Sequence, residues 1–67
     1  MITLTVNGQE RTLEAPTTIA SYLKALDLNG RYIAVARNGA VIAREDFDRV
    51  SLEAGDRVEI VRPAGGG

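Results

Sequence analysis

The sequence predicts an α+β domain in which one helix covers one face of a mixed β-sheet. Short segments near both ends of the chain and in its middle alternate apolar and polar residues with a period of two, which is typical of strands. Residues 19–26 instead place apolar side chains at helical spacing. Asn-Gly pairs at residues 7–8 and 38–39 separate alternating segments, as the tight turns of β-hairpins do.

The first hairpin is predicted from residues 2–6 and 9–14. The segment ITLTV places isoleucine, leucine and valine on one side and two threonines on the other. Asn7 and Gly8 suit a type I′ turn, because both central positions of that turn need positive φ. The returning segment QERTLE has Leu13 as its main inward residue, and its polar character predicts a strand at the edge of the sheet.

A single helix is predicted from about Thr18 to Leu28. Pro16 closes the preceding strand, and a threonine hydroxyl can cap the first turn of the helix. Asn29-Gly30 is expected to end the helix, because both residues tolerate the left-handed conformation found just past a helix terminus. One apolar face results from the spacing i, i+3, i+4 and i+7: Ile19, Tyr22, Leu23 and Leu26.

The second half of the chain predicts another hairpin and a final strand. Residues 31–37 and 40–43 form the hairpin around Asn38-Gly39, and residues 57–61 alternate again as the last strand. Between them, REDFDRVSLEA shows no clean period, so we expect a loop with one helical turn beneath the sheet. Its expected fixed points are Phe47, Val50 and Leu52.

One helix between two hairpins can cover only one face of the sheet. The simplest topology sets the first and last strands side by side and parallel in the middle. This is the β-grasp (ubiquitin-like) fold, with a mixed sheet of four to five strands and one main helix packed on one face. Residues 1–62 are predicted to form the β-grasp domain, and residues 63–67 a flexible Gly-rich C-terminal tail. The expected core consists of Ile2, Leu4, Val6, Leu13, Ile19, Leu23, Leu26, Ile33, Val35, Phe47, Leu52, Val58 and Ile60.

Composition excludes several classes of function. The 67 residues include no cysteine and no histidine, which removes disulfides, Cys/His metal sites and catalysis by either side chain. A net charge of −1 without a basic run gives no case for binding nucleic acid or an anionic membrane. No apolar run approaches the roughly 20 residues of a membrane span, and the N-terminus lacks a secretory signal. We therefore expect a soluble, cytoplasmic protein that is monomeric when free.

The sequence offers no catalytic or metal-binding motif. Glu45, Asp46 and Asp48 form the one acidic cluster, but the spaced ligands of an EF-hand are missing, so a solvated loop is expected. No glycine loop opens a helix with a lysine to hold phosphate. We therefore predict no metal site, no catalytic residue and no cofactor, and a protein that is not an enzyme by itself.

The C-terminal residues PAGGG indicate either a frayed end or a reactive one. Pro63 cannot donate a ladder hydrogen bond, so the chain is expected to leave the sheet there. Five extended residues span roughly 17 Å, enough to enter a cleft in another protein. Without Cβ atoms, Gly65 and Gly66 can thread a constriction that a side chain would block. The carboxylate of Gly67 can then attack the α-phosphate of ATP in a partner's active site, and composition alone leaves both readings open.

Four segments stand in an order that is typical of one family: VNG at residues 6–8, TTIASYLKAL at 17–26, IAVARNGAVIARED at 33–46, and LEAGDRVEIVRP at 52–63 before the final glycines. This set resembles the bacterial sulfur carrier proteins of thiamine biosynthesis, the ThiS family, over the whole chain. The resemblance implies that an E1-like adenylating enzyme of the ThiF type binds ATP and adenylates Gly67. A thiocarboxylate then forms on Gly67 and donates sulfur to a thiazole synthase of the ThiG type. The third glycine, Gly65, departs from many relatives and should make the tail more flexible.

Other readings remain open from the sequence. The same chemistry serves molybdopterin synthesis, whose carriers are usually longer, and cysteine or methionine synthesis. A ubiquitin-like modifier would use the same activation and join Gly67 to lysines of target proteins. A plain interaction module with an idle tail is the third class.

The sheet face away from the helix cannot be covered by this chain, because only one helix is predicted. Ile42 and Val61, near the tail, are therefore predicted to bind the activating enzyme and the sulfur acceptor. Isolated apolar residues are common on protein surfaces, and that ordinary explanation stands beside the functional one.

Overall fold

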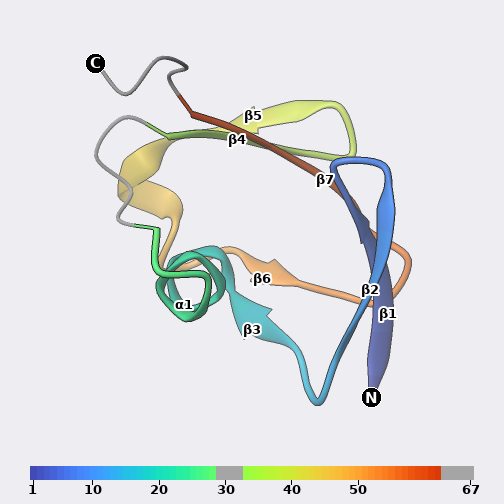
Figure 1. Ribbon diagram of the computed structural model, residues 1–67. Coiled ribbons are helices and arrows are strands. Elements are labelled where there is room, and N and C mark those ends of the chain that lie inside the picture. The colour runs from blue at the N-terminus through green and yellow to red at the C-terminus, as the bar shows by residue number, and fades with distance from the viewer. Residues whose placement is uncertain (29–32, 63–67) are drawn as a thin grey trace.

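The structure is a computed structural model that describes residues 1–28 and 33–62. Five strands form one sheet in the order β2-β1-β7-β4-β5, and β3 and β6 form a separate two-stranded sheet. Helix α1 lies on one side of the main sheet (Figure 1), which confirms the predicted α+β fold with a mixed sheet and one main helix. In chain order the elements are β1 (Ile2–Val6), β2 (Gln9–Leu13), β3 (Thr17–Thr18), α1 (Ile19–Ala25), β4 (Ala34–Arg37), β5 (Ala40–Ile42), η2 (Arg44–Asp46), β6 (Ser51–Leu52) and β7 (Arg57–Val61).

The last strand, β7, lies at the centre of the main sheet. It pairs in parallel with β1, with Thr5 opposite Arg57 and Val6 opposite Val58, and antiparallel with β4 on its other side. The backbone N–H of Thr5 donates to the Asp56 carbonyl oxygen at 2.9 Å. The predicted parallel arrangement of the first and last strands is confirmed.

Both Asn-Gly pairs form hairpin turns with the backbone that the sequence predicts. The φ angles are 52° at Asn7 and 80° at Gly8, and 54° at Asn38 and 87° at Gly39. A Cβ atom added at either glycine would meet nothing within 4 Å. Positive φ, rather than a shortage of space, is therefore the reason for glycine at these positions.

Helix α1 begins where the sequence predicts, because Thr18 caps it. The Thr18 hydroxyl oxygen accepts a hydrogen bond from the Ser21 N–H at 3.1 Å. The first two N–H groups of α1 donate to the carbonyl oxygens of Val50 and Phe47, at 3.0 and 2.8 Å. The loop before β6 thus satisfies backbone groups that a helix start leaves unpaired. The pairing of β3 with β6 was not predicted, since two-residue strands show no period.

The end of the helix differs from the prediction. Helix α1 ends at Ala25, and Asp27 adopts a φ of 61°, so the left-handed residue comes two positions earlier than expected. The Asp27 N–H donates to the Lys24 carbonyl at 3.0 Å, and the Leu28 N–H to the Leu23 carbonyl at 2.8 Å. These two bonds form a Schellman motif, which satisfies the last carbonyl groups of the helix. The predicted terminator Asn29-Gly30 lies outside the described residues.

This early ending moves one leucine out of the core and brings another in. Leu26 is 45% exposed, so its predicted place in the core is wrong. Its spacing suited the apolar face only if the helix continued, whereas the turn at Asp27 folds Leu28 back against the core instead.

The core lies between α1 and the main sheet. Four other residues of the predicted core, Ile2, Leu13, Ile33 and Ile60, are half-buried and pack around its margin. Tyr22, expected on the inward helix face, is fully part of it. The buried core consists of Leu4, Val6, Ile19, Tyr22, Leu23, Val35, Phe47, Leu52 and Val58.

Replacing Asp27 by glycine should stabilise the protein. An L-residue in the left-handed conformation costs about 1–2 kcal/mol, and the Asp27 carboxylate also lies at the negative end of the helix. We expect D27G to raise the free energy of unfolding by about 1 kcal/mol, as measured by urea denaturation. The control D27N removes only the charge and should give a smaller gain. A loss of stability in D27G would show that the Asp27 side chain makes a favourable contribution.

Candidate functional site

The predicted reactive residue Gly67 and the threading glycines Gly65 and Gly66 lie outside the described residues. The structure does place the strand that leads to them. In β7, Val58 and Ile60 face the core, whereas Val61 and the following Arg62 are exposed. The candidate site is therefore the C-terminal end of β7 together with the groups that fix this strand and the sheet face beside it.

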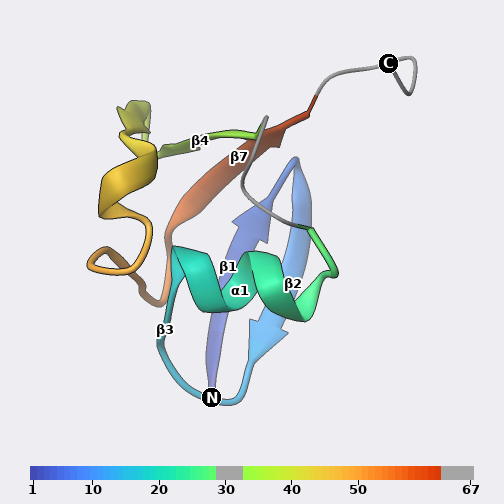
Figure 2. The same cartoon turned by 90° about the vertical axis from the view of Figure 1, so that its left-hand side faces the viewer.

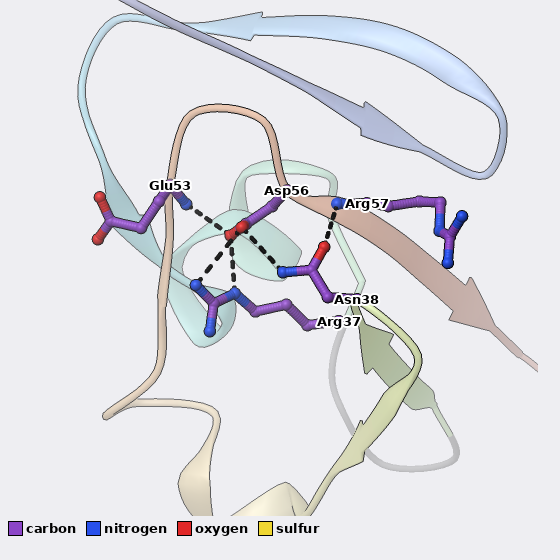
Figure 3. A network of polar contacts seen from close by, with 5 residues as sticks. All are labelled: Arg37, Asn38, Glu53, Asp56 and Arg57. Atoms are coloured by element: carbon purple, nitrogen blue, oxygen red, sulfur yellow. Dashed lines mark hydrogen bonds and ion pairs between the residues drawn. The ribbon is translucent and has the colours of Figure 1, made fainter.

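A buried carboxylate fixes the start of β7. Asp56 is only 6% exposed, and its Oδ2 accepts hydrogen bonds from Arg37 Nε at 2.7 Å and from the Glu53 N–H at 2.8 Å. Its Oδ1 accepts from Asn38 Nδ2 at 3.1 Å. Figure 3 shows these groups converging on Asp56 from β4, from the turn after β4 and from the segment before β7. The sequence indicated only a turn at Gly55-Asp56, because partners 18 and 19 residues away leave no local signal.

The surroundings of Asp56 favour its charged form. Burial by itself raises the pKa of the Asp56 carboxyl. The hydrogen bonds from Arg37, Glu53 and Asn38, together with the positive charge of Arg37, outweigh burial and hold the pKa below its usual value of 3.8. Asp56 therefore stabilises the folded state above that pH. The stabilisation is lost as the pH falls through the lowered pKa of the folded state.

Two asparagines bind the backbone of β7 from opposite sides. Asn38 Oδ1 accepts from the Arg57 N–H at 2.8 Å (Figure 3). Asn7 Oδ1 accepts from the Ile60 N–H at 2.8 Å, and Asn7 Nδ2 donates to the Ile60 carbonyl at 3.2 Å. The sequence predicted these residues as turn formers only. Their second role needs a partner up to 53 residues away in the chain, which no local pattern reveals.

Of the two predicted partner-binding residues, only Val61 lies on the sheet face away from the helix. It is 64% exposed. The prediction that Ile42 shares this face is wrong, because Ile42 pairs directly with buried Val35 and packs against the core. Directly paired residues point to the same side of a sheet, so Val41, which is 78% exposed, lies on the outer face instead.

An apolar stripe crosses the outer face on β7, β4 and β5. The register places Ala34 opposite Val61 and Ala36 opposite Val41, so the four side chains point to the same side, which they share with exposed Glu59 opposite Ala36. Figure 2 shows α1 in front of the sheet, so the stripe lies on the side that α1 does not cover. We call these residues the outer stripe: Ala34, Ala36, Val41 and Val61.

Among the described residues, no group of three or more Asp, Glu, His or Cys side chains is arranged to hold a metal ion. In the acidic segment, Asp46 lies in a 3₁₀ turn and forms an ion pair with Arg49 at 4.0 Å, while Glu45 and Asp48 are exposed. Within residues 1–28 and 33–62, no helix is long and apolar enough to cross a membrane.

Over the described residues, the parallel pairing of β1 with β7 at the centre of a mixed sheet and the packing of α1 on one face define a ubiquitin-like protein of the β-grasp class. The sequence model of the ThiS family matches residues 4–67, so the chain belongs to the ThiS family, as the resemblance predicted.

Solved structures and curated proteins agree with this assignment. The crystal structure of the thiamine biosynthesis protein ThiS from Geobacter metallireducens superposes with a TM-score of 0.82 at 36% identity, covering 98% of this chain and all of that one. A solution NMR structure of the thiamine biosynthesis protein from the same organism gives 0.81, also at 36% identity, covering 98% of this chain and 88% of that one. Thiazole synthases of Paramagnetospirillum magneticum and Magnetococcus marinus are 36% and 37% identical over 96% and 92% of this chain. This chain spans only about a fifth of their length, 20% and 19% respectively.

Replacing Asp56 by asparagine should weaken the fold and change its response to acid. Near pH 7 we expect D56N to lose about 2 kcal/mol of unfolding free energy, because charge-assisted hydrogen bonds from Arg37 and Glu53 are lost. Since the folded-state pKa of Asp56 is lowered, the wild type should lose stability as the pH falls below 3.8, and the difference from D56N should shrink. Urea denaturation from about pH 7 to about pH 2 measures both effects. An unchanged difference across this range would contradict the assignment.

Proposed function

We propose that this chain is a sulfur carrier that bears a thiocarboxylate on Gly67 and donates its sulfur for the thiazole of thiamine. The observation that supports this most directly is the ThiS family match, which extends to residue 67 and so includes the terminal glycines. The neighbouring solved structures are proteins of thiamine biosynthesis. The chain itself is proposed to act as a protein cosubstrate, with catalysis supplied by its partners.

The proposed reaction begins with the Gly67 carboxylate. One of its oxygens attacks the α-phosphorus of ATP, which is bound by an E1-like enzyme of the ThiF type, and pyrophosphate leaves. Hydrosulfide or an equivalent sulfide-level nucleophile then attacks the acyl carbon, the bond from that carbon to AMP breaks, and after loss of the sulfur proton a thiocarboxylate remains. Residues 63–67 can span roughly 17 Å when extended, which suits delivery of the carboxylate into a partner's active site. Gly65 and Gly66 are proposed to pass its entrance because they have no side chains.

The second proposed partner is a thiazole synthase of the ThiG type. Two thiazole synthases contain a segment that resembles nearly the whole of this chain. A carrier-like segment within the same polypeptide as a synthase supports a working relation between them. For this chain, we propose that the relation takes the form of docking between the carrier domain and a thiazole synthase.

The outer stripe is the proposed docking surface for both partners. Its two valines, Val41 and Val61, are 78% and 64% exposed, and Val61 is the last residue of β7. Val61 lies six residues before Gly67, so a partner that binds the stripe can receive the tail at the same time. Ile42 has no part in this surface, because it packs against the core.

Removing Gly67 should abolish adenylation and leave thermal stability unchanged. The reacting carboxylate would then sit one residue short of the ATP, and a displacement of about 1 Å can cost roughly 100-fold in rate. G66F should have nearly the same effect, because its ring would meet the wall of the entrance. ATP–pyrophosphate exchange with the activating enzyme measures the loss, and a melting curve serves as the control for folding.

Two results would contradict the proposal. Full exchange activity in the Gly67 deletion would mean that the glycines are only a frayed end. Mass spectrometry of protein purified from cells gives a second test, since a thiocarboxylate supports the carrier function. Isopeptide conjugates of Gly67 would identify a protein modifier instead, and an invariably unmodified carboxylate would leave the tail without a role.

Charged substitutions in the outer stripe should weaken partner binding and leave the fold intact. We expect V41D combined with V61D to lower the affinity for the activating enzyme and for thiazole synthase at least about tenfold, because two desolvated contacts are lost. T12D, on exposed β2 of the same sheet, is the matched control and should bind normally. Calorimetric titration measures affinity, and equal affinity in both variants would remove the stripe from the interface.

A further inference from the structure

The pairing between β1 and β7 continues beyond the last residue of β1. In the backbone register, Thr5 pairs with Arg57 and Val6 pairs with Val58. The chain then turns away at Asn7. The Asn7 N–H still donates to the Val58 carbonyl oxygen at 2.9 Å. Beyond that point, the main chain of β1 offers nothing further to β7.

The side chain of Asn7 takes over at this position. Its Oδ1 accepts from the Ile60 N–H at 2.8 Å and its Nδ2 donates to the Ile60 carbonyl at 3.2 Å. A carboxamide offers one donor and one acceptor, so the Asn7 side chain alone serves both main-chain groups of Ile60, which a continuing parallel strand would serve from two different residues. We call these two hydrogen bonds the Asn7 clamp.

The clamp holds the last part of β7 on the side opposite β4. Ile60 and Val61 pair with Val35 and Ala34 of β4, and Val61 is the final residue of the strand. Without the clamp, the end of β7 would be held by β4 alone, and both main-chain groups of Ile60 would lose their partner. The seven residues that follow Ile60 can extend by at most about 25 Å, so the point of release also decides the reach of Gly67.

We propose that Asn7 is a positioning residue for the reaction at Gly67, because it fixes where the C-terminal segment leaves the sheet. This rests on the proposed sulfur-carrier function. When the clamp is formed, the end of β7, where the C-terminal segment begins, has a fixed position relative to the outer stripe. An unclamped strand adds at least one residue that the activating enzyme must order on binding. The enzyme still aligns the bound carboxylate itself, so the clamp acts on KM and hardly on kcat.

The chain supplies a matched control in its second Asn-Gly turn. Asn38 has the same φ sign and turn position as Asn7, and its side chain also makes one hydrogen bond as acceptor and one as donor. Its bond to β7 lies at Arg57, at the start of the strand, away from the tail. N7G and N38G both keep the turn, because glycine adopts positive φ readily. Each variant removes only the side-chain bonds.

Amide hydrogen exchange on the free carrier tests the clamp without any partner. In N7G the Ile60 amide should exchange on the order of tenfold faster, whereas the Arg57 amide keeps its protection. In N38G the Arg57 amide should exchange faster, whereas the Ile60 amide keeps its protection. The conservative variant N7D keeps the acceptor for the Ile60 N–H and should restore most of its protection. Unchanged Ile60 exchange in N7G would overturn the clamp.

Steady-state ATP–pyrophosphate exchange, at a temperature where both variants are folded, tests the positioning role. N7G should raise the KM for the carrier roughly tenfold, the cost of ordering about one more residue, with kcat within about twofold. N38G should leave KM near the wild-type value. Equal KM values for N7G and N38G would overturn the role of Asn7 as a positioning residue. If the wild type is not adenylated at all, the proposed function fails and the positioning role with it, while the exchange of Ile60 still decides whether the clamp exists.

Discussion

The parallel pairing of β1 with β7 is the interaction on which the rest of the structure depends. It joins two segments about 50 residues apart through a short register of two residue pairs. It places the C-terminal strand at the centre of the sheet, where β4 can pair with its other side. A central strand is paired along both of its edges, whereas an edge strand would leave one row of its backbone groups unpaired.

So short a parallel register needs further support, and polar side chains provide it. Asp56 binds Arg37, Asn38 and the Glu53 main chain just before β7 begins. Asn7 binds Ile60 near the end of the strand. The asparagines of both type I′ turns therefore do two things at once: they accept positive φ, and they direct a carboxamide at the backbone of β7. An alanine could do neither.

The two faces of the main sheet differ in burial: the inner face packs against α1, and the outer face carries exposed valines. The inner face and α1 bury the hydrophobic core, which no disulfide supplements, since the chain contains no cysteine. The outer face keeps Val41 and Val61 in solvent beside the route to the tail. A small domain has too few residues to cover both faces of a five-stranded sheet, so the outer face of the described sheet stays exposed at these valines.

By itself, the sequence determined the features that depend on neighbours in the chain. Period-two segments predicted β1 and β7 to the residue, and the Asn-Gly pairs predicted both hairpin turns, because φ preference and side-chain alternation are local properties.

Tertiary structure decided the rest. The face of β5 was misassigned at Ile42, because a three-residue strand is too short for its alternation to identify a face and only pairing with Val35 fixes it. The helix ends at Ala25, and the turn at Asp27 lets Leu28 pack against the core, a contact between distant segments that helical spacing does not predict. The bonds of Asp56 to Arg37 and Asn38 and the Asn7 clamp join groups 18 to 53 residues apart, and such contacts exist only once the strands have been brought together.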